Sequence, residues 1–290
     1  MRIQFWGVRG SIPVPGPETV FFGGNTSCVS ARLGQNWVIF DAGTGIRNLG
    51  NVIMNDPVPQ TRMSLFLSHV HWDHIQGFPF FSPAFFNRNH LRIHGQEQQE
   101  GTLGGILAGQ MEGPNFPVTL DMMGARIEFA DLQEGAIVPL YDGEDGSKII
   151  GSVANARLNH PNGVLAYRLE EAETGCSMVY ATDTEHYEGR LDERLVELAR
   201  GADLLVYDGM YTKEEYPYHK GWGHSTWAEG FKVARAAGVK HLVVFHHDPS
   251  HDDVFLAVYE REVQLQAAQE STAIKVEFAR ENMRLDFEAR

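Results

Sequence analysis

Four side chains that bind metal ions well fall within six residues: His69, His71, Asp73 and His74. They follow residues 63–68, a short apolar run typical of a buried strand, so they sit where a strand ends and a loop begins. His69 and His71 can point the same way from an extended backbone, whereas Asp73 and His74 lie beyond the strand and turn elsewhere. A chance cluster is disfavoured, because ionisable groups beside a buried strand are costly without a partner. The motif predicts two metal ions that need further ligands from distant parts of the chain.

Three later segments also end a predicted strand with metal-binding side chains: Asn159-His160-Pro161, Thr182-Asp183-Thr184 and His246-His247-Asp248. Taken singly, a histidine beside proline is commonly a loop residue, and an aspartate after a strand is commonly a turn former. Their repeated placement after strands favours a shared metal site. His246 and His247 point to opposite sides of an extended strand, so only one of them can face the metals.

Asp208 and His224 form a further candidate pair. His224 lies in Gly223-His224-Ser225-Thr226, just before a predicted helix whose start is indicated by a capping box of Thr226 and Glu229. Free N–H groups and the helix dipole at such a position favour an anion such as phosphate. Asp208 ends the apolar run 204–207 and is an acid able to orient an imidazole. The alternative is that His224 is only a loop residue before a helix.

The elements that must position these residues are short strands separated by glycine-rich turns. Strands are predicted over 2–8, 27–33, 37–40, 63–68, 149–158, 164–169, 177–181, 204–207, 242–245, 274–278 and 284–287. Helices are predicted over 46–54, 191–200, 227–237 and 253–268, and residues 101–117 suggest a helix and a loop that form either a lid or an insertion. No repeat or linker is evident, so residues 1–290 are expected to form a single domain of two strand-rich halves.

Composition narrows the function classes. The chain has 290 residues, 43% of them apolar, and a formal net charge of −14, which offers no basic face for a long nucleic acid and favours small substrates. Cys28 and Cys176 have no nearby cysteine partner, so buried free thiols and a reducing compartment are expected rather than a disulfide. The start of the chain lacks the apolar segment of a signal peptide, and no membrane span is evident. We therefore expect a cytoplasmic protein.

The order and spacing of the metal-binding motifs resemble the metallo-β-lactamase superfamily over most of the chain. The resemblance implies an α/β fold, an αββα four-layer sandwich in which two mixed β-sheets are flanked by helices, with a two-metal site at one edge. It implies one ion on His69, His71 and His160, a second on Asp73, His74 and His246, and Asp183 bridging both. These nitrogen and oxygen ligands suit two zinc ions per chain, with manganese or iron as substitutes. Asp41, after the strand 37–40, resembles the acid that orients a ligand histidine in this superfamily.

The pair of Asp208 and His224 resembles the branch of ribonuclease Z and the cyclic phosphodiesterases. In that branch an acidic residue, commonly glutamate, supports a Gly-His-Ser-Thr histidine that assists phosphate binding and protonates the leaving group. The tRNA-processing members usually carry a long arm between the third and fourth metal motifs. Only 23 positions separate His160 from Asp183, which leaves no room for an arm. The expected substrate is therefore a small phosphodiester, with cyclic nucleotides as the leading candidates and no long nucleic acid.

The resemblance leaves three features with two interpretations each. Arg9 either meets a phosphate or forms a structural ion pair, and His247 either contacts the substrate or a ligand, or lies at the surface. The clustered aromatic residues are expected in the core or at a dimer contact more than stacked on a base; they are Phe78, Phe80, Phe81, Phe85 and Phe86. A homodimer is expected from the resemblance alone.

The combined prediction is a two-metal phosphodiesterase. A zinc-activated hydroxide, held with the help of Asp73 or Asp183, attacks phosphorus, while His224, backed by Asp208, protonates the departing oxygen. Two rival functions stay open. One is a hydrolase of the same fold that acts on a lactone or a thioester, and the other is a non-catalytic sensor that binds nucleotides without cleaving them.

Overall fold

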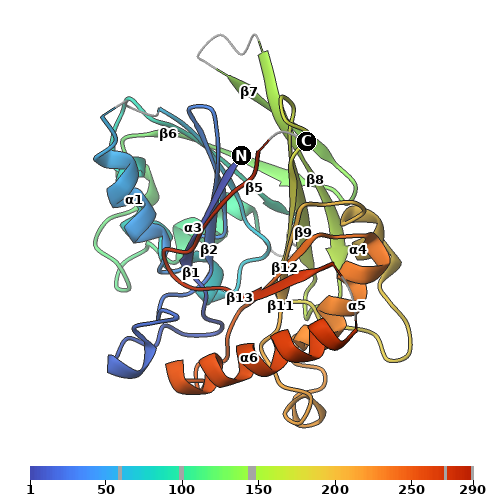
Figure 1. Ribbon diagram of the computed structural model, residues 1–290. Coiled ribbons are helices and arrows are strands. Elements are labelled where there is room, and N and C mark those ends of the chain that lie inside the picture. The colour runs from blue at the N-terminus through green and yellow to red at the C-terminus, as the bar shows by residue number, and fades with distance from the viewer. Residues whose placement is uncertain (58–60, 98–100, 143–147, 271–272, 289–290) are drawn as a thin grey trace.

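Two β-sheets pack face to face in the computed structural model, which describes residues 1–57, 61–97, 101–142, 148–270 and 273–288 (Figure 1). The first sheet has, in order, β14 (Arg284–Asp286), β1 (Arg2–Gly7), β2 (Cys28–Leu33), β3 (Asn36–Phe40), β4 (Arg62–Phe66), β5 (His90–Gln96) and β6 (Arg126–Leu132). The second has β13 (Lys275–Phe278), β12 (His241–Phe245), β11 (Leu204–Asp208), β10 (Ser177–Ala181), β9 (Val164–Glu171), β8 (Lys148–Leu158) and β7 (Ile137–Asp142).

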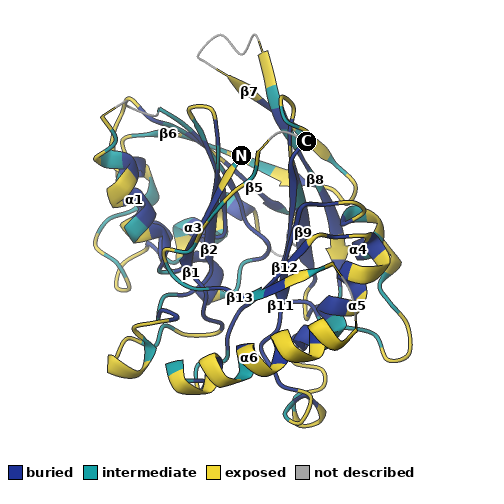
Figure 2. Ribbon diagram, viewed as in Figure 1, coloured by how far each residue is buried: buried dark blue, intermediate teal, exposed yellow. Residues whose placement is uncertain are grey.

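Helices cover the outer face of each sheet and expose their own outer sides to solvent (Figure 2). The first sheet carries α1 (Ile46–Met54) and α3 (Leu103–Gly109), and the second carries α4 (Glu193–Leu198), α5 (Trp227–Ala237) and α6 (Asp253–Gln269). A single turn, α2 (Trp72–Ile75), lies within the first metal-binding motif. Aromatic side chains from both sheets, including Phe40, Tyr167 and Phe245, fill the space between them. These layers confirm the predicted αββα sandwich of two mixed sheets.

The direction of the strands brings the predicted ligands to one edge. In the first sheet β3, β4 and β5 are parallel, and in the second β10, β11 and β12 are parallel. Both β8 and β10 pair antiparallel with β9, so β8 runs in the same direction as β10. Residues that follow the carboxyl ends of these strands therefore gather at a common edge of their sheet, the usual place for a site in such folds.

Most predicted elements match the structure, and α1, α5 and β10 have the predicted bounds. Three strands were not predicted, namely β5, β6 and β7. Both β6 and β7 are edge strands with many exposed residues, and β7 contains Pro139, so neither shows a clear apolar alternation. The predicted capping box is wrong in detail. Thr226 precedes α5, but its side chain makes no capping hydrogen bond. The Glu229 carboxylate instead accepts a hydrogen bond from the Lys232 side chain.

The segment that suggested a lid is a packed part of the scaffold over its first half. Leu103, Leu107 and Met111 are buried in the core on the outer side of the first sheet. Cys28 and Cys176 are free and buried, which confirms the expected thiols. None of the helices in the described ranges combines the length and the apolar character that crossing a membrane requires.

His94 on β5 makes stability sensitive to acid. Its ring is 3% exposed, stacks on Phe66 at 4.6 Å, and has no hydrogen-bond partner at either nitrogen among the described residues. Burial, followed by repulsion from Arg92, lowers the pKa of His94 to about 4. An unfolded histidine has a pKa near 6.5, so between these two values the unfolded state binds more protons and stability falls as the pH falls.

We expect His94→Phe to reduce this acid-dependent loss. Urea unfolding of the metal-free protein at pH 7 and pH 4.5 measures it, since chelation removes the contribution of metal release from both proteins. The loss of unfolding free energy between the two pH values should be smaller in the variant by about 2–3 kcal/mol. Equal losses in the two proteins would contradict a buried, neutral His94.

Candidate metal centre

Seven histidine and aspartate side chains from both sheets lie together at the common edge. They form two groups, His69 with His71 and His160, and Asp73 with His74, Asp183 and His246. Within each group the possible ligand atoms lie within 4.8 Å of one another. The segments that carry them follow β4, β8, β10 and β12, as the positions after the strand ends predicted.

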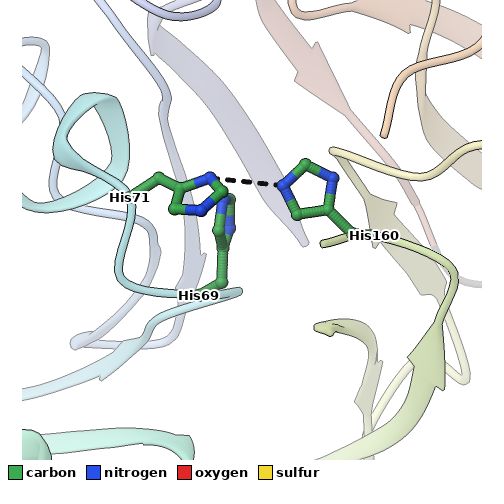
Figure 3. A group of neighbouring side chains, drawn as sticks. All are labelled: His69, His71 and His160. Atoms are coloured by element: carbon green, nitrogen blue, oxygen red, sulfur yellow. Dashed lines mark hydrogen bonds between the residues drawn. The ribbon is translucent and has the colours of Figure 1, made fainter. Parts of the chain in front are cut away.

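The first group consists of three imidazoles. His69 and His71 come from the loop after β4, and His160 faces them from the second sheet (Figure 3). His160 Nδ1 lies 2.9 Å from the carbonyl oxygen of Gly223, so Nδ1 carries the proton and the lone pair is on Nε2, 3.2 Å from His71 Nδ1. Burial lowers the pKa of all three histidines, which favours the neutral form that binds metals.

The second group alternates imidazoles with carboxylates. His74 Nε2 lies 3.1 Å from Asp73 Oδ2 and 3.2 Å from Asp183 Oδ1. His246 Nε2 lies 3.2 Å from the same two oxygen atoms. The other oxygen of Asp183, Oδ2, is 3.8 Å from His69 Nε2 in the first group. Asp183 therefore stands between the two groups with one oxygen toward each.

The chemistry of the second group fits a divalent cation. His74 Nδ1 donates to Asp41 Oδ2 at 2.7 Å, which turns His74 Nε2 toward the carboxylate oxygens of Asp73 and Asp183. The buried Nε2 atoms of His69 and His74 have no hydrogen-bond partner among the described residues. Acceptor atoms that face one another repel unless a proton or a cation lies between them. A metal ion in each group would satisfy them.

Asp41 holds the second group in place, as the resemblance implied. It accepts hydrogen bonds from the backbone N–H and the hydroxyl of Ser68, and from the Tyr180 hydroxyl at 2.8 Å. Asp41, Asp183 and His246 have backbone φ angles of 60°, 51° and 63°, values uncommon for residues other than glycine. Such strain costs about 1–3 kcal/mol per residue and is typical of functional sites.

His224 lies beside the second group. Its Nδ1 donates to Asp208 Oδ2 at 2.8 Å, and its ring stacks on His246 with centroids 5.0 Å apart. Burial lowers the pKa of His224, but the charges of Asp208 and Asp183 outweigh it and raise the pKa to about 9. The shorter acid at position 208 therefore reaches the imidazole and leaves Nε2 as the atom that can meet a substrate.

A third grouping of possible ligands consists of Asp208, His224 and His246. The oxygens of Asp208 already accept hydrogen bonds from His224 and from the backbone N–H groups of Met210 and Ser225, both at 3.1 Å. These bonds favour Asp208 as the residue that orients His224 rather than as a metal ligand.

A comparison with protein families agrees with the fold and the site. The model described as "Beta-lactamase superfamily domain" matches residues 36–247. The chain belongs to the β-lactamase superfamily. The matched region contains all seven side chains of the two groups.

The chain is similar in sequence to curated ribonuclease Z proteins and in fold to several solved structures. A ribonuclease Z of Synechococcus sp. (strain WH7803) is 28% identical over 87% of this chain and 86% of its own length. The crystal structure of human tRNase Z, short form, has a TM-score of 0.66 at 20% identity and covers 99% of both chains. A diphosphatase of the PhnP family has a TM-score of 0.69 at 16% identity, over 99% of this chain and 98% of its own. The structural likenesses concern the fold, and the chain is a ribonuclease Z-like hydrolase of the metallo-β-lactamase family.

Of the two interpretations of Arg9, the structure disfavours the phosphate contact and gives the side chain a structural role, with backbone carbonyls as its partners. Arg9 is fully buried, and its guanidinium donates to backbone carbonyls, from Nε to Gly23 at 2.7 Å and from Nη1 to His251 at 2.5 Å. Its neighbours are the residues that reach the site. The Ser11 N–H donates to Asp73 Oδ2 at 2.8 Å, and a Cβ at Gly10 would come within 2.5 Å of the His246 ring. Glycine at position 10 is therefore what lets this loop approach the centre.

His247 is not a surface residue, and it lies outside the two metal-binding groups. Its Nε2 donates to the carbonyl of Ala279 at 2.8 Å, and its ring packs on Phe278 in the core. Burial lowers the pKa of His247 to about 3, so the ring is neutral. His246 is the one that faces the centre, as the resemblance implied.

Sequence reasoning missed Glu185, which fixes the loop before His224. Its carboxylate accepts hydrogen bonds from the backbone N–H of Gly221 at 2.8 Å, that of Gly223 at 3.0 Å and the Tyr216 hydroxyl at 2.9 Å. The only signal was its position two residues after Asp183. Of the clustered aromatic residues, Phe78 and Phe81 are buried, as expected of core residues, whereas Phe80, Phe85 and Phe86 are exposed.

Proposed function

We propose that the chain is a metal-dependent phosphodiesterase for small phosphodiesters, with cyclic nucleotides as the leading candidates. The observation that carries the proposal is the 2.8 Å hydrogen bond between His224 Nδ1 and Asp208, beside the two metal-binding groups. An imidazole fixed by a buried carboxylate is a suitable general acid for a poor leaving group such as a ribose oxygen. It also lies near the amino end of α5, where an anion is favoured.

We propose that His69, His71 and His160 would hold one ion and Asp73, His74 and His246 a second, with Asp183 between the two groups. Divalent ions held there would supply positive charge to the phosphoryl oxygens and lower the pKa of water towards neutrality. Zinc is our first choice because the donors are nitrogen and oxygen in a compact buried site, and manganese or iron(II) are substitutes.

The chain's own residues divide the remaining work. Asp73 Oδ2, which the Ser11 N–H also contacts, helps to hold the attacking water. His224 Nε2 gives its proton to the departing oxygen, and Asp208 keeps the proton of Nδ1 in place and stabilises the charged imidazole. The Nε2 atom must therefore face the scissile bond on the side away from the attacking water.

The second candidate substrate is RNA, because the curated relatives are named ribonuclease Z. These names conflict in part with the expectation that the protein binds no long nucleic acid. Two observations favour small substrates. The β9 and β10 strands fill most of the interval between His160 and Asp183, so no arm protrudes there. The net charge of −14 also opposes a polyanion.

A substrate panel tests the proposal. The zinc-loaded protein is incubated with 2′,3′- and 3′,5′-cyclic nucleotides, linear dinucleotides, a precursor tRNA, a lactone and a thioester, and the products are identified by mass. We expect cyclic nucleotides to gain one water and become monophosphates. Three outcomes would reject the proposal. Turnover of the acyl substrates alone would indicate a lactone or thioester hydrolase, and cleavage of the tRNA alone would indicate an RNA-processing enzyme. A nucleotide that binds and returns unchanged would indicate a non-catalytic sensor.

The remaining expectations keep the status of predictions. They are the homodimer, the cytoplasmic location and the single domain over residues 1–290. Size-exclusion chromatography with light scattering measures the first of them directly.

A further inference from the structure

Two large aromatic side chains are exposed next to the metal centre. Trp72 is 79% exposed and lies between His71 and Asp73 in the chain. Trp222 is 62% exposed and precedes Gly223 and His224. Tryptophan usually buries most of its surface, since leaving an indole in water forfeits much of its hydrophobic gain. Two exposed tryptophans beside a site offer apolar surface to a ligand.

The segments that carry these tryptophans meet at His160. His71 Nδ1 lies 3.2 Å from His160 Nε2, and His160 Nδ1 donates to the carbonyl of Gly223 at 2.9 Å. The contact with Gly223 is so close that a Cβ there would lie 2.1 Å from His160 Nδ1. Trp72, the first residue of α2, and Trp222 therefore belong to two segments that adjoin the same metal-binding group.

Trp222 is also part of an ordered row of rings that leads to His224. Its ring meets the edge of His219 at 5.0 Å, and His219 stacks on Tyr211 at 4.3 Å. Tyr211 in turn meets His224 edge-on at 5.9 Å. Glu185 fixes the backbone of this loop on both sides of Trp222. Trp222 is thus presented by a rigid support, which reduces the entropy lost when a planar ligand stacks on it.

We propose that Trp72 and Trp222 form a subsite that stacks the nucleobase of the phosphodiester substrate. The inference rests on the proposed function and deepens it, because it selects nucleoside phosphodiesters over simple alkyl phosphodiesters. A chain with a net charge of −14 gains little long-range attraction for a phosphate, so uncharged surfaces must supply much of the selectivity. A base offers such a surface whatever its identity, so the subsite tolerates different bases.

Two substrates with the same leaving group test the subsite. Thymidine 5′-(p-nitrophenyl phosphate) and methyl p-nitrophenyl phosphate differ only in one ester group, which is a thymidine with its base in the first and a methyl group in the second. We expect Trp72→Ala and Trp222→Ala each to lower the preference for the thymidine substrate, the ratio of the two kcat/KM values, by about 10-fold, chiefly through KM. Trp222→Phe should recover most of the preference. Leu265→Ala, which truncates a 58% exposed side chain on α6, should leave it unchanged.

A second readout does not depend on turnover. Thymidine 5′-monophosphate should quench the tryptophan fluorescence of the metal-loaded protein. The double variant that carries both Trp72→Ala and Trp222→Ala should lose this quenching and keep its metal content. The inference would be overturned if both single variants kept the wild-type preference for the thymidine substrate, or if the quenching persisted in the double variant. It would also be overturned if the variants changed the oligomeric state and left the preference unchanged. If the wild type cleaves neither substrate, the proposed function itself fails, and the quenching still reports on the subsite.

Discussion

Asp183→Asn is expected to lower phosphodiester turnover by about 10³-fold or more. Asp183 places one oxygen 3.2 Å from His74 and His246 and the other 3.8 Å from His69, so it serves both metal-binding groups. An amide lacks the charge needed to bridge two cations, and loss of their charge at the phosphoryl group removes several kcal/mol of transition-state stabilisation. Asparagine tolerates the left-handed backbone at this position, so the fold should survive.

Metal content and rate have to be measured on the same sample. Plasma mass spectrometry should find fewer than two ions per chain in Asp183→Asn, and circular dichroism should be that of the wild type. The matched control is Asp286→Asn, which changes a surface carboxylate paired with Arg2 at 2.7 Å and should alter neither quantity. A variant that keeps two ions and normal turnover would refute the bridging assignment.

His224→Ala is expected to lower kcat for a cyclic nucleotide by about 10²–10⁴-fold and to keep the metals. The loss should depend on the leaving group, because p-nitrophenolate departs without a proton and a ribose oxygen does not. A smaller loss with bis-p-nitrophenyl phosphate than with the cyclic nucleotide therefore identifies proton donation rather than general damage. Asp208→Asn should act in the same direction, since it no longer fixes the Nδ1 proton of His224.

The control for His224 lies on β12. His241 is the first residue of this strand, and His246 follows its last residue. His241 therefore lies at the opposite end of the strand from the metal centre, where it pairs with Glu277 at 2.8 Å. His241→Ala should therefore leave kcat unchanged. Equal losses of kcat for both leaving groups in His224→Ala would show that His224 binds the phosphate without donating a proton.

The positions of the ligands could be predicted because each of them follows a strand. Parallel strands of one sheet end at the same edge, so side chains far apart in sequence, such as Asp183 after β10 and His246 after β12, meet there. The pairing of ligands into two groups came from the family resemblance, and the structure groups the same side chains. Their assignment to bound ions stays a prediction that metal analysis decides.

One local feature explains why Arg9 and His247 lie away from the metal centre. They form an isolated parallel bridge, and His246 beside it has a left-handed backbone with a φ of 63°. Gly10 and His246 face the metal centre, which turns Arg9 and His247 into the protein. Residue types alone suggested that Arg9 reaches the site, because it is charged. The bridge instead places Gly10 against the His246 ring.

Other features depend on partners that sequence spacing does not reveal. Glu185 binds backbone N–H groups of Gly221 and Gly223, and a backbone donor leaves no trace in residue types. The strands β5 and β6 contain polar residues that weaken the apolar pattern, although Leu91 and Ile93 on β5 are fully buried. Tertiary pairing rather than local preference defines these strands.

A zinc titration of the metal-free protein tests the central claim most directly. Hydrolysis of a 2′,3′-cyclic nucleotide is followed while zinc is added, and bound zinc is measured in the same samples. The structure predicts no turnover without metal, a rise with added zinc and saturation at two ions per chain. Full turnover without metal, or none once two ions are bound, would contradict a two-metal phosphodiesterase.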